Sequence, residues 1–409
     1  MRWRAGCRQG ISTNPLGFVS FATIGFPHAE PVTSATPSNE PRGSVEIVIS
    51  QRKVRSRFES VARFGAVEDL RPPSSYELKL PEEIGFERRS ERLTQVNMEG
   101  NWLVSVRGAT IQPGGILTKG KRLHLASFRT GNIRENTRHL KVKSKAGRSY
   151  FVVGKRVERL TKVQRLKEAF FFDSEYPDEF GHTFLETFSR IWPLIDYPEL
   201  RDVPLVTSAS RTELIRALLE LMGLGEVKII QISSPVTVSR LWVSSQSYQL
   251  GKGFTPEAQN IYARVRRHLS IKDSGRKLFL SREGLQTRTG RKLRNEREVE
   301  GLFSDFGFET VRPHELPFPE QVSLYSACSE MAGPTGSAMF NRIFLRKPSK
   351  EILLGPSNYI LPDHAHLRMM VGGDVKFVVN GQPLEPNRSP QSGSWSLSLD
   401  VLRDALQNA

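Results

Sequence analysis

The sequence predicts an α/β protein in which parallel sheets follow a β-rich N-terminal region. From about residue 180 to 356, short apolar runs alternate with helical patterns, and this alternation is typical of parallel strands joined by right-handed crossovers. Residues 100–156 differ, because short β-rich runs are separated there by turns containing glycine and asparagine, without a long helical period. A chain of 409 residues is also long enough for two or three domains.

The first β-α-β unit is predicted between residues 181 and 232. Its first helix is indicated by six apolar residues that fall on one helical face. Its second helix begins with a capping-box pattern of Ser210 with Glu213 and ends at Gly223. The predicted elements are a helix at 181–195, a strand at 203–208, a helix at 210–223 and a strand at 227–232.

A second alternating series is predicted after a basic helix at 256–269. The expected elements are strands at 277–281, 308–312, 330–333 and 351–355, with helices at 295–307, 319–329 and 337–345. The series predicts an open parallel sheet with helices on both faces. In such sheets ligands bind at the carboxyl ends of the strands.

Two loops at predicted strand ends have the composition of a phosphate site. The loop Gly-Pro-Thr-Gly-Ser at 333–337 precedes a helical segment, and glycine there would let the backbone and free N–H groups approach an anion. The alternative is a simple turn. Ser281 and Arg282 lie at the tip of another strand, and a guanidinium group grips phosphate oxygens in bidentate fashion. Arg288 and Arg294 are expected to be solvated.

The net charge of +16 is concentrated in one segment. Residues 119–167 contain sixteen Lys and Arg against two acidic residues. The charge fits solvated strand faces, which also discourage aggregation, or a surface that contacts anionic lipid or a phosphorylated ligand. Nucleic acid is not favoured as a partner, because no recognition motif or regularly interleaved aromatic residues accompany the charge.

Several classes of protein are excluded by composition. Cys7 and Cys328 cannot form a disulfide framework, and no paired-cysteine metal spacing is present. No stretch approaches the roughly 18 uninterrupted apolar residues of a membrane span. The N-terminus faintly resembles a signal peptide but lacks a cleavage site, and residues 27–45 read as a flexible lead-in. The sequence therefore predicts a cytoplasmic protein.

Four blocks carry a resemblance to a known family. They read GHTFLETFSRIW, RKLRNEREVEGLFSDFGFETVRP, PFPEQVSLYSACSEMAGPTGSAMFN and WSLSLDVLRDAL. In order and spacing they resemble glycosyltransferase family 61, whose bacterial members are often capsular polysaccharide biosynthesis proteins. The resemblance is continuous from about 180 to 356.

The resemblance implies a GT-B fold with two Rossmann-like domains. The expected division is a poorly defined N-terminal region at 1–95, a β-rich and Rossmann-like acceptor domain at 96–250, a nucleotide-sugar-binding domain at 251–370 and a tail with a closing helix at 371–409. The implied activity is inverting transfer from a nucleotide sugar, commonly UDP-linked, to a polysaccharide or lipid-linked acceptor in capsule or exopolysaccharide synthesis. No metal or cofactor is implied, and the expected location is the cytoplasm, peripheral at the inner face of the membrane.

The expected nucleotide-binding residues come from the resemblance and from the two loops. They are Ser281, Arg282, Arg291, Asn295, Glu296, Glu320, Gln321, Gly333, Thr335, Gly336, Ser337 and Asn341. Two positions depart from the family pattern, because Thr335 stands where many members have histidine and Leu353 where members often have glutamate. These departures favour an alternative, a catalytically degenerate GT-B protein that binds a glycan or polyanion without transfer.

His182 and Glu186 are the candidate catalytic residues. An inverting transfer needs a general base to take the proton of the attacking hydroxyl. The two residues are spaced i and i+4, so they share a helical face, and that face is expected to look away from the core. His182 is the expected base, with Glu186, Asp173 and Glu175 as competitors. Alternatively, the pair caps the helix at a domain interface.

Overall fold

The computed structural model describes most of the chain after residue 64. The described residues are 65–79, 83–84, 93–119, 122–127, 140–145, 148–153, 164–269, 275–285, 291–345, 350–357, 359, 362–385 and 393–408. The signal-like N-terminus, the lead-in at 27–45 and Arg288 lie outside them, as do most side chains of the basic segment 119–167. In this described part of the chain, no helix is both long and apolar enough to cross a bilayer.

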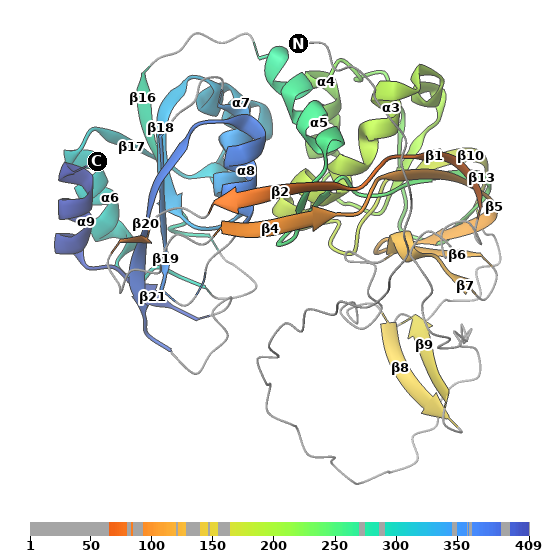
Figure 1. The fold of residues 1–409 in the computed structure, drawn as a ribbon, viewed down its shortest axis with the longest axis horizontal. Helices are drawn as coiled ribbons and strands as arrows, with labels where there is room; N and C mark the ends of the chain where they lie inside the picture. The colour runs from red at the N-terminus through yellow and green to blue at the C-terminus, as the bar shows by residue number, and fades with distance from the viewer. Residues whose placement is uncertain are drawn as a thin grey trace, which may run out of the picture. The chain divides into compact units, whose positions relative to one another are not determined.

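The first sheet joins a parallel half to an antiparallel half (Figure 1). Its strand order is β12-β11-β10-β13-β5-β6-β7, and β1 also pairs with β5. The first four are parallel, so the predicted β-α-β unit is confirmed, and β5, β6 and β7 supply the β-rich region in antiparallel pairing. The strands are β1 (Ala66–Leu70), β5 (Trp102–Gln112), β6 (Ile116–Lys119), β7 (Arg122–Leu123), β10 (Gln164–Phe171), β11 (Leu205–Thr207), β12 (Ile229–Gln231) and β13 (Val236–Ser244).

The helix predicted at 181–195 is present, but its pitch changes along the chain. It consists of α2 (Phe180–His182), a π-helical turn (Thr183–Thr187), a 3-10 turn (Phe188–Ile191) and α3 (Trp192–Asp196). Helix α4 (Thr212–Leu221) follows β11. Its predicted capping box is wrong: the Ser210 hydroxyl donates to Oδ1 of Asp178 at 2.7 Å, and α4 has no side-chain cap. The Ser210 hydroxyl, which would accept a hydrogen bond in a capping box, instead donates to a carboxylate 32 positions away in the sequence.

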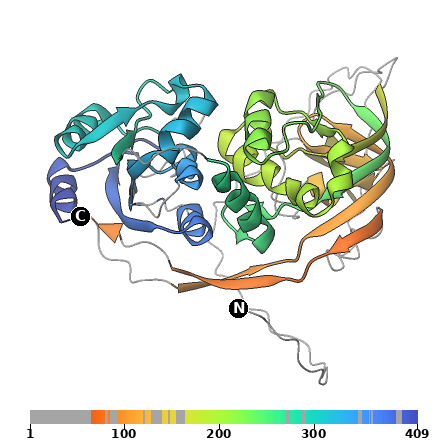
Figure 2. The same cartoon turned by 90° about the horizontal axis from the view of Figure 1, so that it is seen from above.

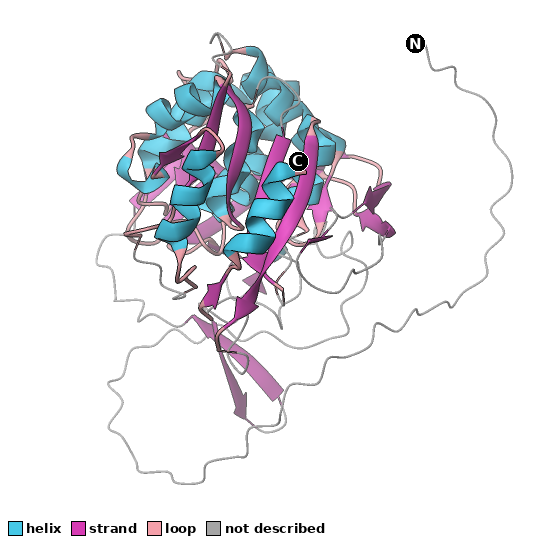
Figure 3. Cartoon of the chain, turned by 90° about the vertical axis from the view of Figure 1, so that its left-hand side faces the viewer, coloured by secondary structure: helices cyan, strands magenta, loops and turns pink. Residues whose placement is uncertain are grey.

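The second sheet has the predicted parallel order and helices on both faces (Figure 3). Its order is β17-β16-β18-β19-β20, with β21 antiparallel at the end and β3 parallel to β20. The segment predicted as a helix at 337–345 is a 3-10 helix, η6 (Ser337–Phe344). The other elements are β3 (Glu83–Ile84), β16 (Arg276–Leu280), α6 (Glu296–Asp305), β17 (Phe308–Val311), α7 (Phe318–Ser326), β18 (Cys328–Pro334), β19 (Lys350–Pro356), α8 (Asp363–Val371), β20 (Asp374–Pro383), β21 (Trp395–Ser396) and α9 (Leu399–Gln407).

Alternate residues of the second sheet pack into different cores. Phe279 and Ile352 face α6 and α9, where they pack with Phe303 and Leu402. Leu278 and Leu353 face the other side and join a larger core. That core continues into the first sheet and includes α5 (Pro256–Arg267). The mixed α/β class with parallel sheets is confirmed, whereas the GT-B division and its domain boundaries remain predictions.

Residues 65–98 form an arm that contributes to both sheets. We call these residues, in their described parts, the N-terminal arm. Strand β1 pairs in the first sheet and β3 in the second, while β2 (Ser74–Lys79) pairs with β4 (Leu93–Met98) in between. The strands β1, β2 and β4 run as a continuous band of orange in Figure 2. Residues 65–95 belong to the region predicted to be poorly defined, because strand partners so far away in the sequence give no local signal.

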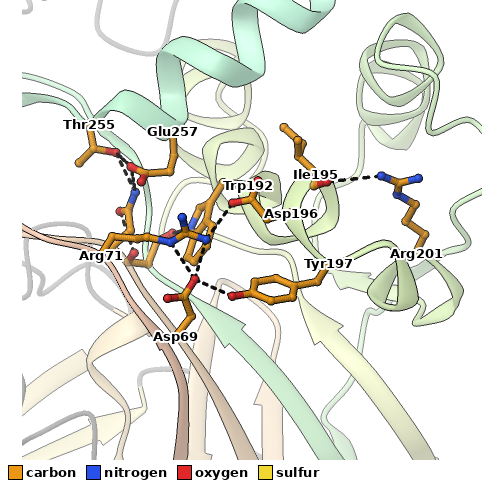
Figure 4. Close-up of polar contacts among 11 residues, drawn as sticks. Asp69, Arg71, Trp192, Ile195, Asp196, Tyr197, Arg201, Thr255 and Glu257 are labelled. Carbon is orange, nitrogen blue, oxygen red and sulfur yellow. Dashed lines mark hydrogen bonds and ion pairs between the residues drawn. The ribbon is translucent and has the colours of Figure 1, made fainter. Parts of the chain in front are cut away.

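Polar contacts anchor the arm to α3 and the residue that follows it (Figure 4). The Arg71 guanidinium binds Asp69 at 2.7 Å and Asp196 at 3.0 Å, and lies 5.3 Å from the ring centre of Trp192. The Tyr197 hydroxyl donates to Asp69 at 2.8 Å. These contacts join the end of β1 to α3 and to Tyr197, which follows it.

Two further hairpins lie among the described residues, as do the 3-10 helices η1 (Leu125–Ser127), η4 (Pro198–Asp202) and η5 (Pro313–Glu315). Strands β8 (Leu140–Lys145) and β9 (Arg148–Val153) form one, and β14 (Tyr248–Gln249) and β15 (Gly253–Phe254) form the other. The second hairpin leads into α5 and packs beside the π-helical turn.

Candidate active site at the carboxyl ends of the second sheet

The strand order of the second sheet creates a point at which the connections diverge. From β16 the chain moves outward to β17 on one side, and it then returns to β18 and continues through β19 to β20 on the other. Ligands bind open α/β sheets at the carboxyl ends of the strands at such a point. Strand β16 ends at Leu280 and leads to Ser281 and Arg282, and β18 ends at Pro334 and leads to Thr335 and Gly336. Both predicted phosphate loops therefore lie at this point.

Arg282 and Arg291 lie close together there. Burial and the neighbouring positive charge of Arg291 together lower the pKa of Arg282 to about 10, against the opposing effect of Glu296. Arg291 donates from Nη2 to the carbonyl of Thr335 at 3.1 Å, and its guanidinium lies 4.7 Å from the ring centre of Tyr359. Among the described residues, neither guanidinium makes an ion pair with a carboxylate. Two adjacent cations of this kind favour the binding of an anion.

Gly336 keeps the space between the two arginines open. A Cβ at this position would lie 3.3 Å from Nη2 of Arg291 and 3.5 Å from Nη1 of Arg282. Its φ of 158° is one that other residues rarely adopt. Gly333 has a different role, because a Cβ there would lie 2.8 Å from the carbonyl oxygen of Leu280. Gly333 thus allows β18 to pack against β16, whereas Gly336 opens the site.

Glu296 and Ser281 hold the tip of β16 in place. Glu296 accepts hydrogen bonds from the backbone N–H of Arg282 and, at 3.3 Å, from the Ser281 hydroxyl. Burial raises the pKa of Glu296 above its ordinary value. Glu300 also accepts from Ser281 and pairs with Arg312 at 3.0 Å. These contacts fix the backbone on which Arg282 is carried.

The side chains of Asn295 and Gln321 bond to backbone groups, and Glu320 lines another groove. The Asn295 amide binds the backbone of Leu397, donating at 2.8 Å and accepting at 3.1 Å. Gln321 donates to the carbonyls of Pro313 and Leu316 at 2.7 and 3.0 Å and so closes that loop. Glu320 lines a separate surface groove with Glu309 and Arg312.

Two cavities meet at the arginine pair. The smaller, about 200 Å³, is lined by Arg282, Arg291, Glu296, Thr335 and Trp395. The larger, about 640 Å³, is lined by both arginines and by Ser281, Gln321, Ser337 and Asn341, with Phe180 and Phe318 among its apolar residues. A ligand bound at the arginines therefore has space on two sides.

The structure brings the catalytic candidates beside the glycine loop. A Cβ on Gly181 would lie 2.9 Å from Cβ of Ser337, although 156 positions separate the two. Next to Gly181, Nδ1 of His182 lies 2.6 Å from Oε2 of Glu186 and the imidazole stacks on Tyr176 with ring centres 4.5 Å apart. Because an ionised carboxylate only accepts, Nδ1 carries the proton and Nε2 is the basic atom.

The expectation that both residues look away from the core is wrong for Glu186. Its side chain is 1% exposed, and Oε1 accepts from the N–H of Leu250 at 2.9 Å. The segment after β14 covers it, which a helical pattern alone cannot reveal. His182 remains 22% exposed.

The competing carboxylates are buried in the first sheet. Asp173 is fully buried, and its oxygens accept from the N–H groups of Ser174 and Ser208, both at 2.9 Å. Burial raises its pKa to about 6. Asp173 therefore ties the ends of β10 and β11 together. Glu175 is 5% exposed.

Sequence reasoning missed a buried charged cluster behind the loop. Arg342 pairs with Glu351, and Nδ1 of His364 lies 3.7 Å from Glu351. All three side chains are at most 1% exposed. Glu351 and Leu353 lie two residues apart on β19, so they share a face, and Leu353 packs in the apolar core. In the sequence, this cluster is indicated by Glu351, a carboxylate inside an otherwise apolar strand.

The fold and this site define an α/β protein with a pair of arginines at the carboxyl ends of a parallel sheet. Residues 180–352 match the family model of glycosyltransferase 61, so this segment of the chain is a member of that family. The matched residues include the helix of His182, both arginines and the glycine loop. Membership implies transfer of a sugar from a donor to an acceptor. A comparison with curated proteins finds no match for the chain.

Proposed function

We propose that this protein transfers a sugar from a nucleoside-diphosphate sugar, with UDP as the nucleotide. The observation that carries the proposal is the pair Arg282 and Arg291, which face each other across Gly336 and have no carboxylate partner among the described residues. A diphosphate leaving group gains negative charge as its bond to the sugar breaks, and fixed cations stabilise that charge. The arginines thus supply the positive charge, and no divalent metal is required.

The base in this proposal is His182. Its Nε2 takes the proton of an acceptor hydroxyl while that oxygen bonds to the anomeric carbon and the diphosphate oxygen leaves. Attack from the side opposite the diphosphate inverts the configuration. The Glu186 carboxylate holds Nδ1 and stabilises the imidazolium that forms. The contact of Gly181 with Ser337 supports this role, because it brings the histidine next to the phosphate loop.

The acceptor in this proposal is a polysaccharide or a lipid-linked glycan of capsule or exopolysaccharide synthesis. This part rests on the family resemblance, together with the basic segment 119–167, whose charge suits an anionic membrane surface. A location at the inner face of the membrane belongs to the same proposal.

Binding of UDP to the Arg282→Ala variant tests the proposal. Loss of a hydrogen bond to a charged group costs about 1.5–3 kcal/mol, so calorimetry should show UDP affinity at least tenfold weaker. Arg403→Ala is the matched control, because Arg403 is 52% exposed on α9, where it pairs with Asp400 at 4.0 Å. Unchanged affinity in Arg282→Ala would show that the donor site is elsewhere.

A transfer assay separates an enzyme from a binding protein. Release of UDP from a panel of UDP-sugars should be abolished by His182→Ala and should continue in EDTA. UDP that binds to the arginine pair without any release of UDP from a sugar donor would favour the catalytically degenerate alternative.

A further inference from the structure

The turn of the β14–β15 hairpin directs two consecutive backbone N–H groups at two buried carboxylates. The N–H of Leu250 donates to Oε1 of Glu186 at 2.9 Å, and the N–H of Gly251 donates to Oδ1 of Asp363 at 2.9 Å. Both acidic side chains are 1% exposed. Glu186 lies on the π-helical turn, whereas Asp363 is the first residue of α8. The hairpin turn therefore joins two elements that are far apart in the sequence.

The turn also compensates the repulsion between the two carboxylates. Burial raises the pKa of Asp363, the N–H of Gly251 lowers it, and the negative charge of Glu186 also raises it. Buried like charges are costly, and a backbone N–H directed at each carboxylate offsets that cost. The hydroxyl of Tyr248 on β14 donates a second hydrogen bond to Asp363 at 3.1 Å. Asp363 thus holds both β14 and the turn that follows it.

The same turn fixes the orientation of the proposed base. Glu186 accepts from Leu250 with Oε1, and its other oxygen, Oε2, lies 2.6 Å from Nδ1 of His182. Because the bond to Oε1 restrains the plane of the carboxylate, it also restrains the direction from which Oε2 meets the imidazole. A carboxylate in this position holds an imidazole in the correct tautomer and orientation. A shift of the turn would therefore move the base.

We propose that Asp363 is a positioning residue for the pair of His182 and Glu186. It holds the hairpin turn, and the turn keeps Glu186 in the orientation that presents Nε2 of His182 to the acceptor hydroxyl. This inference rests on the proposed function, in which His182 is the base. Asp363 acts through Glu186 and takes no part in bond making.

Substitution of Asp363 tests the proposal. Asp363→Ala removes the acceptor of both hydrogen bonds, whereas Asp363→Asn keeps an oxygen that can accept them. Release of UDP from a UDP-sugar should slow about tenfold to hundredfold in Asp363→Ala, because a small misplacement of a catalytic group costs about that much. Asp363→Asn should recover most of the rate. Affinity for UDP should stay within about twofold in both variants, since Asp363 is not among the residues that line the two cavities at the arginine pair.

Proton NMR of the protein with isotope-labelled histidine gives a readout that does not depend on activity. The proton on Nδ1 of His182, shared with Glu186, should give a downfield resonance that is assigned by its absence in His182→Ala. The resonance should be present in the wild type and in Asp363→Asn. It should broaden or disappear in Asp363→Ala.

Asn101→Ala is the matched structural control. Asn101 is also 1% exposed and binds residues on both sides of the hairpin, donating to Thr255 at 2.7 Å and accepting from Ser245 at 2.9 Å. These contacts flank the hairpin and lie outside its turn. Asn101→Ala should therefore lower the melting temperature and leave the His182 resonance and the rate of UDP release unchanged.

Three results would overturn the inference. One is an Asp363→Ala protein that keeps both the resonance and the rate, whatever its melting temperature. Another is an equal loss of both in Asn101→Ala, which would show that general stability of the hairpin is responsible. The third is an Asp363→Asn protein as defective as Asp363→Ala, which would show that the charge matters and the hydrogen bonds do not.

Tyr248→Phe replaces Asp363→Ala if the latter does not fold. It keeps the aromatic ring and removes one of the two hydrogen bonds to Asp363. The resonance should broaden and the rate should fall, and no change in either would also overturn the inference. A wild-type protein that releases no UDP from any UDP-sugar refutes the proposed function instead, and the resonance still reports whether Asp363 orients His182.

Discussion

Gly336 is a residue at which a side chain would compete directly with the ligand. Its missing Cβ faces both guanidinium groups, at 3.3 and 3.5 Å. Thr335, the residue before it, is 4% exposed, and its hydroxyl lies 3.1 Å from where a Cβ on Gly355 would be. The loop is therefore packed on one side and open only toward the arginines.

Gly336→Val should abolish UDP binding, with at least a hundredfold loss of affinity by calorimetry. Its side chain would occupy the space between the arginines, and backbone strain would also lower the free energy of unfolding by about 1–3 kcal/mol. Gly301 on α6 is the control, because no atom lies within 4 Å of the position its Cβ would take. Gly301→Ala should leave UDP affinity unchanged and stabilise the protein by up to about 1 kcal/mol. A Gly336→Val protein that binds UDP normally would identify the loop as a simple turn.

Helix α8 is the element that connects the site to the N-terminal arm. At its start, Asp363 accepts from the Tyr248 hydroxyl at 3.1 Å and from the N–H of Gly251 at 2.9 Å. Further along, Nδ1 of His366 lies 3.0 Å from the hydroxyl of Tyr76 on the arm. Ala365 packs with apolar residues of β2 and β4. The arm thus depends on a helix that also contacts the hairpin covering Glu186.

The contact of α8 with the arm should weaken in acid. Burial lowers the pKa of His366 to about 4 from its ordinary value of 6.5. The folded state therefore favours the neutral ring, and the unfolded chain takes up the proton first. This stabilisation is complete above pH 6.5 and is lost as the pH falls toward 4, by on the order of 3 kcal/mol.

Urea unfolding of the wild type and of His366→Gln at pH 7, 6, 5 and 4 measures this effect. The free-energy difference between the two proteins should shift in favour of the variant as the pH falls. His124, whose pKa burial lowers to about 3, is present in both proteins and cancels. Parallel curves over this range would contradict the assignment.

For the molecule as a whole, the arm is the segment that both sheets share. Its cluster of Asp69, Arg71 and Asp196 is only partly exposed. Burial raises the pKa of Asp196, and the negative charge of Glu257 also raises it. The carboxylates outnumber the cation at this place (Figure 4). Removal of Arg71 would leave their charges uncompensated.

Arg71→Ala should lower the free energy of unfolding by about 1–3 kcal/mol, because it strands two partly buried carboxylates. Arg240 is the matched control: it is 51% exposed, pairs with Glu168 at 3.6 Å and lies over the ring of Trp242 at 4.3 Å. Arg240→Ala should cost less than about 1 kcal/mol. Equal losses in urea unfolding would mean that the arm is not anchored by this cluster.

Much of the second sheet and half of the site could be predicted from the sequence. The strands and helices follow from periodicity within about fifteen residues, and Arg282 and Gly336 were placed correctly at strand ends. Asn295 and Glu320 show the limit, because a motif position does not reveal whether a side chain turns toward the cavity or toward Leu397.

The sequence by itself determined which segments are strands and helices, because burial of one face imposes a local repeat. It also indicated the family, because the order and spacing of the four sequence blocks are themselves features of the sequence. Only the tertiary structure decided that Gly181 lies against Ser337, that Glu186 is covered, and that the arm enters both sheets. These facts depend on which distant surfaces pack together. That choice minimises the exposed apolar area and the unpaired polar groups of the whole chain, and no short stretch of sequence contains it.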